Sequence, residues 1–76
     1  PDNNLTNAQI AEYIGKVSEE EALAYKITFG LSAGRQIGEL VNEGNGKSIR
    51  CYANSKRSEG TKLRLACLKV CETRGF

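Results

Sequence analysis

Two helix-start signals lie close together in the first third of the chain, and they restrict its fold more than any other feature. The first, Thr6-Asn7-Ala8-Gln9, has the form of a capping box. In such a box the Thr6 hydroxyl accepts from the backbone N–H of Gln9, and the Gln9 side chain reaches back. Leu5 and Ile10 flank the box and are placed to form a hydrophobic staple. Apolar residues follow at helical spacing, so the sequence predicts a first helix over residues 7–16.

The second signal, Ser18-Glu19-Glu20-Glu21, repeats this arrangement with Glu21 in the reciprocal position. Val17 and Ala22 form the corresponding staple pair. The three glutamates also occupy the first turn, where the positive end of the helix dipole favours carboxylates. A capped helix start therefore explains the acidic run better than a metal site or a catalytic site does.

The extent of this second helix has two interpretations. One long helix, ending at Glu43 before a Gly-Asn-Gly turn, accounts for an apolar stripe made of Leu23, Ile27, Leu31, Gly34, Ile37 and Val41. Residues 25–31, however, also alternate with period two and are rich in strand formers. Gly30 and Gly34 weaken a helix by about 1 kcal/mol each, so they can instead mark a break, with Ser32 capping a separate helix. We favour the long helix.

The remainder of the chain predicts one extended segment and one helix. Residues 48–53 alternate, which puts Ile49, Cys51 and Ala53 on one face of a short extended segment. After a polar loop, a helix over residues 61–73 is expected, with Gly75 as its C-cap. Its apolar stripe comprises Leu63, Cys67, Val70 and Cys71, and Lys62, Ala66 and Lys69 lie on the opposite face.

These elements predict a mostly α fold, with a single domain over residues 1–76 that has about three helices and one short extended segment. The alternative is an α+β sandwich with an antiparallel sheet, because residues 63, 65 and 67 alternate as well. A chain this short buries only about 60% of its unfolded surface, so its core needs additional support.

Charge divides the chain into two halves. Residues 45–76 carry eight of the eleven basic residues against two glutamates, a net charge of +6, whereas residues 1–44 have a net charge of −4. Such asymmetry bears on partners rather than on fold. We therefore predict a basic binding surface made of Arg50, Lys56, Arg57, Lys62 and Lys69.

The sequence contains no histidine, which excludes Ser-His-Asp and Cys-His catalysis and imidazole metal ligands. It also lacks tryptophan and has only five aromatic residues, so a pocket lined by stacking rings is not expected. We predict no enzymatic activity, no cofactor and no metal site. Three thiolates could ligate a metal, but they lack the C-x-x-C spacing of zinc motifs.

The three cysteines are Cys51, Cys67 and Cys71. Because Cys51 is expected to face the core, a disulfide from it to Cys67 or Cys71 would pin the extended segment to the last helix and add about 3 kcal/mol. The alternative is three reduced, buried thiols in an intracellular protein. The disulfide interpretation predicts a secreted or periplasmic protein, and the alternative predicts a cytoplasmic one. The leftover thiol also allows an intermolecular bridge.

These features favour a small non-enzymatic interaction protein of the inhibitor, immunity-protein or toxin-subunit kind, with another protein as its partner. The opposed charges also favour a homodimer or a larger homo-oligomer. The alternative function is nucleic-acid binding through the basic C-terminal half, with Tyr52 stacking on a base. Binding to an anionic membrane surface through the basic face is a weaker hypothesis.

Overall fold

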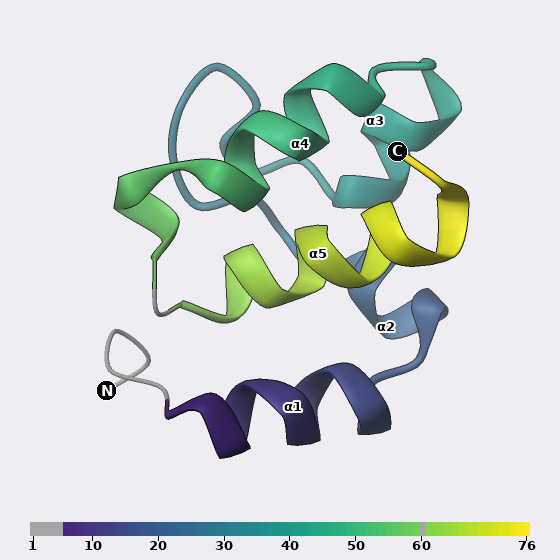
Figure 1. Ribbon diagram of the computed structural model, residues 1–76. Helices are drawn as coiled ribbons and strands as arrows, with labels where there is room; N and C mark the ends of the chain where they lie inside the picture. The colour runs from purple at the N-terminus through teal and green to yellow at the C-terminus, as the bar shows by residue number, and fades with distance from the viewer. Residues whose placement is uncertain (1–5, 60) are drawn as a thin grey trace.

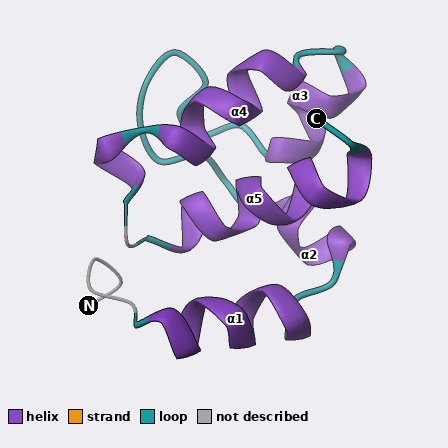
Figure 2. Cartoon of the chain, viewed as in Figure 1, coloured by secondary structure: helices purple, strands orange, loops and turns teal. Residues whose placement is uncertain are grey.

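The structure, a computed structural model, describes residues 6–59 and 61–76, apart from the side chain of Ile10. The described residues form α1 (Asn7–Lys16), α2 (Glu19–Ala24), α3 (Ile37–Asn42), α4 (Gly46–Asn54), the 3-10 helix η2 (Lys56–Ser58) and α5 (Lys62–Arg74). Within this part of the chain, β pairing is limited to one isolated bridge between Lys26 and Gln36. The prediction of a mostly α fold is confirmed, and the α+β sandwich is not supported (Figure 2).

The helices with explicit capping signals begin where the sequence predicts, and α1 and α5 also end within one residue of the prediction. At α1, Gln9 N donates to Thr6 Oγ1 at 3.1 Å and Thr6 N donates to Gln9 Oε1 at 2.9 Å, which completes the capping box. At α2, Glu21 N donates to Ser18 Oγ at 3.1 Å. At α5, Thr61 is the N-cap, and Gly75 ends the helix in the left-handed conformation with φ of 73°. The predicted staple between Leu5 and Ile10 lies outside the described residues.

The predicted long helix to Glu43 is wrong. Helix α2 ends at Ala24, and helical structure resumes only at Ile37. Gly30 and Gly34 adopt φ values of 84° and 86°, which are incompatible with a right-handed helix. The break at these glycines follows the second interpretation, but its proposed cap at Ser32 is also wrong. Helix α3 starts instead after Gln36, whose backbone N–H donates to Glu39 Oε2 at 2.9 Å.

The predicted extended segment over residues 48–53 is wrong as well, because these residues belong to α4. Asn45 caps this helix by accepting from Ser48 N at 3.3 Å. Ile49 and Ala53 are one helical turn apart and both are buried, so the helix gives this segment an apolar face as good as that of a strand. Cys51 consequently projects outward and is exposed, which contradicts its expected position in the core.

Helix α5 is the centre of the molecule, with α4 on one side and α1 on the other (Figure 1). On the α4 side, one buried cluster joins all the later elements; it contains Ala22, Ile27, Ile37, Leu40, Ile49, Ala53, Leu63, Ala66, Cys67 and Val70. Ala66 is fully buried in this cluster, so its predicted place on a solvent-facing side of the helix is wrong. On the α1 side, Leu65 and Val17 are buried outside the cluster. No helix in the described part of the chain has the length and apolar character needed to cross a membrane.

Candidate functional site

The connection between α2 and α3 is a closed loop with a fixed base. The bridge between Lys26 and Gln36 brings its two ends together, and Ile27 N donates to Arg35 O at 2.8 Å. Gly34 N donates to Ile27 O at 2.7 Å, and the Ile27 side chain is buried in the core cluster. We call residues 28–35, which project beyond this base, the Leu31 loop. The two ends of its backbone are therefore held together at this base.

The tip of the Leu31 loop is a hydrogen-bonded turn that leaves an apolar side chain in solvent. Ala33 N donates to Gly30 O at 3.2 Å, and Arg35 N donates to Ser32 O at 3.0 Å. Leu31 is fully exposed, and it is the most exposed large apolar side chain among the described residues. A lone exposed leucine is ordinary on a protein surface. The turn bonds hold this exposed leucine at a fixed place on the surface.

Helix α4 holds the loop from the side through one aromatic residue on each element. Tyr52 Oη donates to Phe29 O at 2.9 Å, and the two rings meet edge to face with centroids 5.2 Å apart. The Arg57 guanidinium lies 4.3 Å from the centroid of the Phe29 ring, in cation–π geometry. A Cβ on Gly30 would lie 2.7 Å from Tyr52 Oη, so a side chain at this position would displace the anchor.

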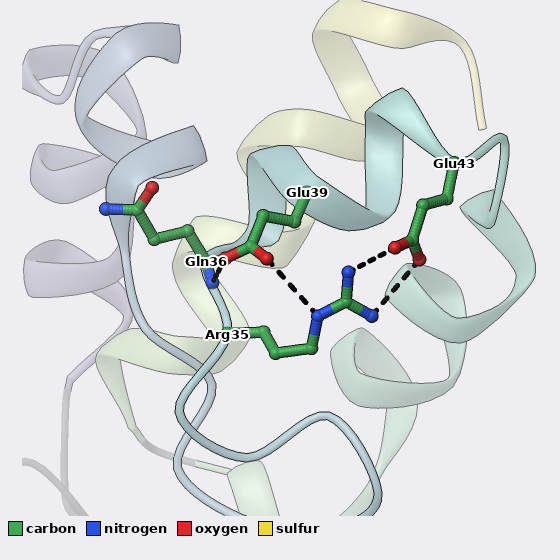
Figure 3. A network of polar contacts seen from close by, with 4 residues as sticks. All are labelled: Arg35, Gln36, Glu39 and Glu43. Carbon is green, nitrogen blue, oxygen red and sulfur yellow. Dashed lines mark hydrogen bonds and ion pairs between the residues drawn. The ribbon is translucent and has the colours of Figure 1, made fainter.

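Arg35 fixes the other end of the loop to α3 (Figure 3). Its Nε lies 3.3 Å from Glu39 Oε1, its Nη1 donates to Glu43 Oε1 at 3.1 Å, and its Nη2 pairs with Glu43 Oε2. The hydrogen bond from Gln36 N, followed by Arg35, lowers the pKa of Glu39, and Arg35 lowers the pKa of Glu43. Both carboxylates therefore stay charged at neutral pH. The charge of Arg35 is neutralised within the protein.

A hollow of about 320 Å³ separates the loop tip from α4. The loop contributes Phe29, Gly30, Leu31 and Ser32 to its wall, and the α4 side contributes Ser48, Cys51, Tyr52 and Ser55. This volume is at the lower end of the range for small-molecule pockets, which is roughly 300–1,000 Å³. The lining has no ionisable group except the thiol of Cys51 and the Tyr52 hydroxyl, which is already bonded. The hollow therefore suits an apolar side chain better than a cofactor or a reacting substrate.

The structure divides the predicted basic surface into two parts. Arg50, Lys56 and Arg57 are exposed on α4 and η2. Arg57 lies against the Phe29 ring of the Leu31 loop, whereas Arg50 lies near Cys71 of α5. Lys62 and Lys69 belong to the side of α5 that α1 covers. Lys69 Nζ donates to Ile14 O at 3.1 Å, at the end of α1. Lys62 lines a different hollow together with α1 residues. The five predicted residues thus do not form one surface.

The basic half is not neutralised by the acidic half. Among the described residues, Arg74 and Glu19, 2.7 Å apart, form the only ion pair that joins the two halves of the sequence. The other ion pairs in this part of the chain lie within the first half, at Lys16–Glu12 and at Arg35 with Glu39 and Glu43. The cations of α4 and η2 are therefore not neutralised by an ion pair with any described carboxylate.

The three cysteines occupy three different environments as free thiols. Burial raises the pKa of Cys67 to about 12, and burial also raises the pKa of the half-buried Cys71. Cys51 is exposed at the rim of the hollow. The disulfide between Cys51 and Cys67 or Cys71 stays a prediction. No group of three or more metal-ligating side chains occurs in the described ranges, 6–59 and 61–76.

A second hollow, of about 510 Å³, lies between α1 and α5. Its charged lining is mixed, since Glu12 and Lys16 pair with each other at 3.0 Å and Glu21 and Lys62 add one charge of each sign. Burial raises the pKa of Tyr13 in its wall, so this hydroxyl stays protonated at neutral pH. The walls present no pair of a nucleophile and a base, and no charge of one sign predominates.

The chain matches no protein-family model, and no curated protein or solved structure shows significant similarity to it. The candidate site therefore depends on the geometry of the Leu31 loop. Sequence reasoning missed this site, because it placed Leu31 on the apolar stripe of a long helix. The two glycines, at positions 30 and 34, were the signal that could have found it.

Proposed function

We propose that this chain is a non-enzymatic protein-binding module, of the inhibitor, immunity-protein or toxin-subunit kind, that uses the Leu31 loop to engage another protein. The observation that carries the proposal is a fully exposed leucine at the tip of a loop whose backbone is fixed at its base, tip and side. Binding energy at protein interfaces concentrates in a few central side chains.

A preformed loop supports this function for an energetic reason. Each rotamer-rich side chain that is immobilised on binding costs about 0.5–1.5 kcal/mol, and ordering a flexible loop costs more. The Tyr52 hydroxyl and the internal turn bonds already impose this order in the free protein. Burial of Leu31 in a partner therefore contributes about 1.5–3 kcal/mol with little of it offset by ordering.

The test compares two substitutions that add the same charge at exposed positions. Leu31→Asp places a carboxylate at the loop tip, and Ala8→Asp places one in the first turn of α1, where the helix dipole accommodates it. The wild-type chain is used to isolate a stoichiometric partner from its native source, and the partner is then produced separately for calorimetry. We expect Leu31→Asp to weaken binding about 100-fold or more and Ala8→Asp to leave it unchanged. Equal affinities for the two variants would refute the role of the loop.

Nucleic-acid binding is the second candidate, because the cations of α4 and η2 have no carboxylate partner among the described residues. Two contacts weigh against it. The Tyr52 ring meets the Phe29 ring edge to face, and Arg57 lies over the Phe29 ring, so both aromatic rings already contact neighbouring side chains. A salt series with single-stranded DNA and RNA tests this candidate. Measurable affinity that falls steeply with salt would favour it over the protein-binding proposal.

Export and self-association remain predictions, as does binding to an anionic membrane surface. The apolar stripe of α5 is buried in the core, so it offers no apolar face to a membrane. A free-thiol count by mass spectrometry on native material tests the compartment. One free thiol per chain supports a disulfide and export, and three support a reducing compartment.

A further inference from the structure

The two segments of the chain that supply the lining of the hollow contain cations and no carboxylate. Residues 25–34 contain Lys26 and no carboxylate. Residues 46–58 contain Lys47, Arg50, Lys56 and Arg57 and no carboxylate either. All five cations are exposed, and none of them forms an ion pair with a described residue. Arg57 lies against the Phe29 ring, and Lys47 adjoins the lining residue Ser48 in the sequence. Positive charge therefore lies beside the hollow, whose lining combines Leu31 and Phe29 with serine hydroxyls.

We infer that the occupant of this site is an acidic protein segment in which an apolar side chain lies between carboxylates. This inference rests on the proposed function and specifies the chemistry of the partner. The apolar side chain would pack against Leu31 and fill the hollow of about 320 Å³. The flanking carboxylates would meet Arg57, which lies against Phe29, and Lys47, which adjoins Ser48. Charge complementarity of this kind accelerates association and excludes basic partners.

Lys47 is a cation that directly precedes a residue lining the hollow. Lys47 is exposed in the first turn of α4, next to Ser48, and Cys51 lies one helical turn further on. Ser48 and Cys51 both line the hollow together with Leu31. Arg57, on the other side, contacts the Phe29 ring of the loop. Apolar contact and cationic contact are thus available to the same ligand within a few residues.

A phosphate backbone fits this surface less well than an acidic segment does. Phosphates are satisfied by cations alone, and they would leave Leu31 and the apolar lining uncovered. Single-strand binders also need free aromatic faces, and both rings at this site are engaged with other side chains. An acidic segment with an apolar centre uses every feature of the site.

The chain offers a closely matched pair of charge variants. Lys47→Glu reverses the charge of a cation next to the lining residue Ser48, in the first turn of α4. Lys62→Glu reverses one in the first turn of α5, on the side that α1 covers. Both changes alter the net charge equally, and both place a carboxylate where the helix dipole favours it. A difference between the variants therefore reports on location and not on total charge.

The probe is a phage-displayed library of random twelve-residue peptides, selected on the intact immobilised chain, with Leu31→Asp used for counter-selection. We expect enriched peptides that combine an aliphatic or aromatic residue with an excess of Asp and Glu. Their synthetic forms should lose about tenfold in affinity to Lys47→Glu and nothing to Lys62→Glu. Their affinity should also fall between 0.1 M and 1 M NaCl, since the Debye length shortens from about 10 Å to about 3 Å.

Enriched peptides that depend on Leu31 but lack acidic residues would overturn this inference and leave the proposed function standing. Enrichment that does not depend on Leu31, or no enrichment at all, would overturn both. Displacement of the peptides by a twenty-residue single-stranded DNA that itself binds at 0.1 M NaCl and loses affinity to Lys47→Glu would assign the site to nucleic acid and overturn the inference.

Discussion

The two sides of α5 differ in how tightly they are packed. On the α4 side, α3, α4, α5 and the buried Ile27 share one continuous cluster of fully buried side chains. On the α1 side, Val17 and Leu65 are buried outside that cluster, Tyr13 and Ile14 are half-buried, and an open hollow of about 510 Å³ remains. A single side-chain hydrogen bond among the described residues, from Lys69 Nζ to Ile14 O, ties α1 to α5.

This difference indicates where a binding element can be held rigidly. The Leu31 loop is attached to the well-packed side, through Ile27 in the core and Tyr52 on α4. Helix α1 belongs to the side with fewer buried contacts, and such regions open at lower free energy than the core does. We therefore expect the loop to keep its shape when α1 is disturbed, and to lose it when the α4 side is disturbed.

The largest effect is expected from truncating a core residue on the α4 side. Ile49→Ala should lower the free energy of unfolding by about 2–5 kcal/mol, because it leaves a cavity where Ile49 is fully buried. Leu65→Ala on the α1 side should cost about 2 kcal/mol or less, because α1 can move in and the neighbouring hollow is already open. Urea unfolding followed by circular dichroism measures both. A larger loss for Leu65→Ala would reverse the comparison.

Next in size is the effect of a methyl group on the two loop glycines. Gly30→Ala and Gly34→Ala both impose a positive φ on alanine, which costs about 1–2 kcal/mol. Position 30 adds a clash with Tyr52 Oη, whereas the space around position 34 is open, so Gly30→Ala should be the more destabilising change. Removing the hydroxyl with Tyr52→Phe should bring the two substitutions closer together in a double-mutant cycle. Equal losses of unfolding free energy in the wild-type background would show that a side chain at position 30 does not clash with Tyr52.

The contribution of Cys67 between pH 8 and pH 10 should be smaller. Its pKa of about 12 in the folded chain, against 9.0 for an ordinary thiol, means that the unfolded chain loses this proton first as pH rises. The stability it contributes is therefore complete below pH 9 and is lost progressively between pH 9 and 12, by about 1.4 kcal/mol per unit. Urea unfolding at pH 8 and pH 10 should show a shallower decline for Cys67→Ala than for the wild type. Identical declines would contradict the burial of this thiol.

The sequence predicted the elements whose signals are local. The caps at Thr6 and Ser18 and the C-cap at Gly75 each act within one helical turn, so α1, the start of α2, and α5 could be found without knowledge of the tertiary structure. Helix α4 was missed because Ile49, Cys51 and Ala53 alternate by coincidence, although Ile49 and Ala53 are also spaced one helical turn apart. The N-cap at Asn45 was the local signal that favours the helix.

The two glycines, at positions 30 and 34, signalled a break in the helix, but the exposure of Leu31 could not be predicted. Leu31 lies at the correct spacing for a helix stripe, and its exposure depends on the bridge between Lys26 and Gln36 and on the Tyr52 bond, which spans 23 residues. The basic surface was predicted from composition, and its division followed from α1 packing against Lys62 and Lys69. Contacts of this kind between distant segments leave no local signal in the sequence.

Amide hydrogen exchange, followed residue by residue in NMR spectra, tests the preformed loop most directly. The amides of Ile27, Ala33 and Gly34 donate hydrogen bonds within the loop and its base, so they should exchange at least about tenfold more slowly than in an unstructured peptide. Tyr52→Phe should accelerate them and leave the amides of α1 unchanged. Exchange of these three amides at the unstructured rate in the wild-type chain would show that the loop is not preformed, and would contradict the account.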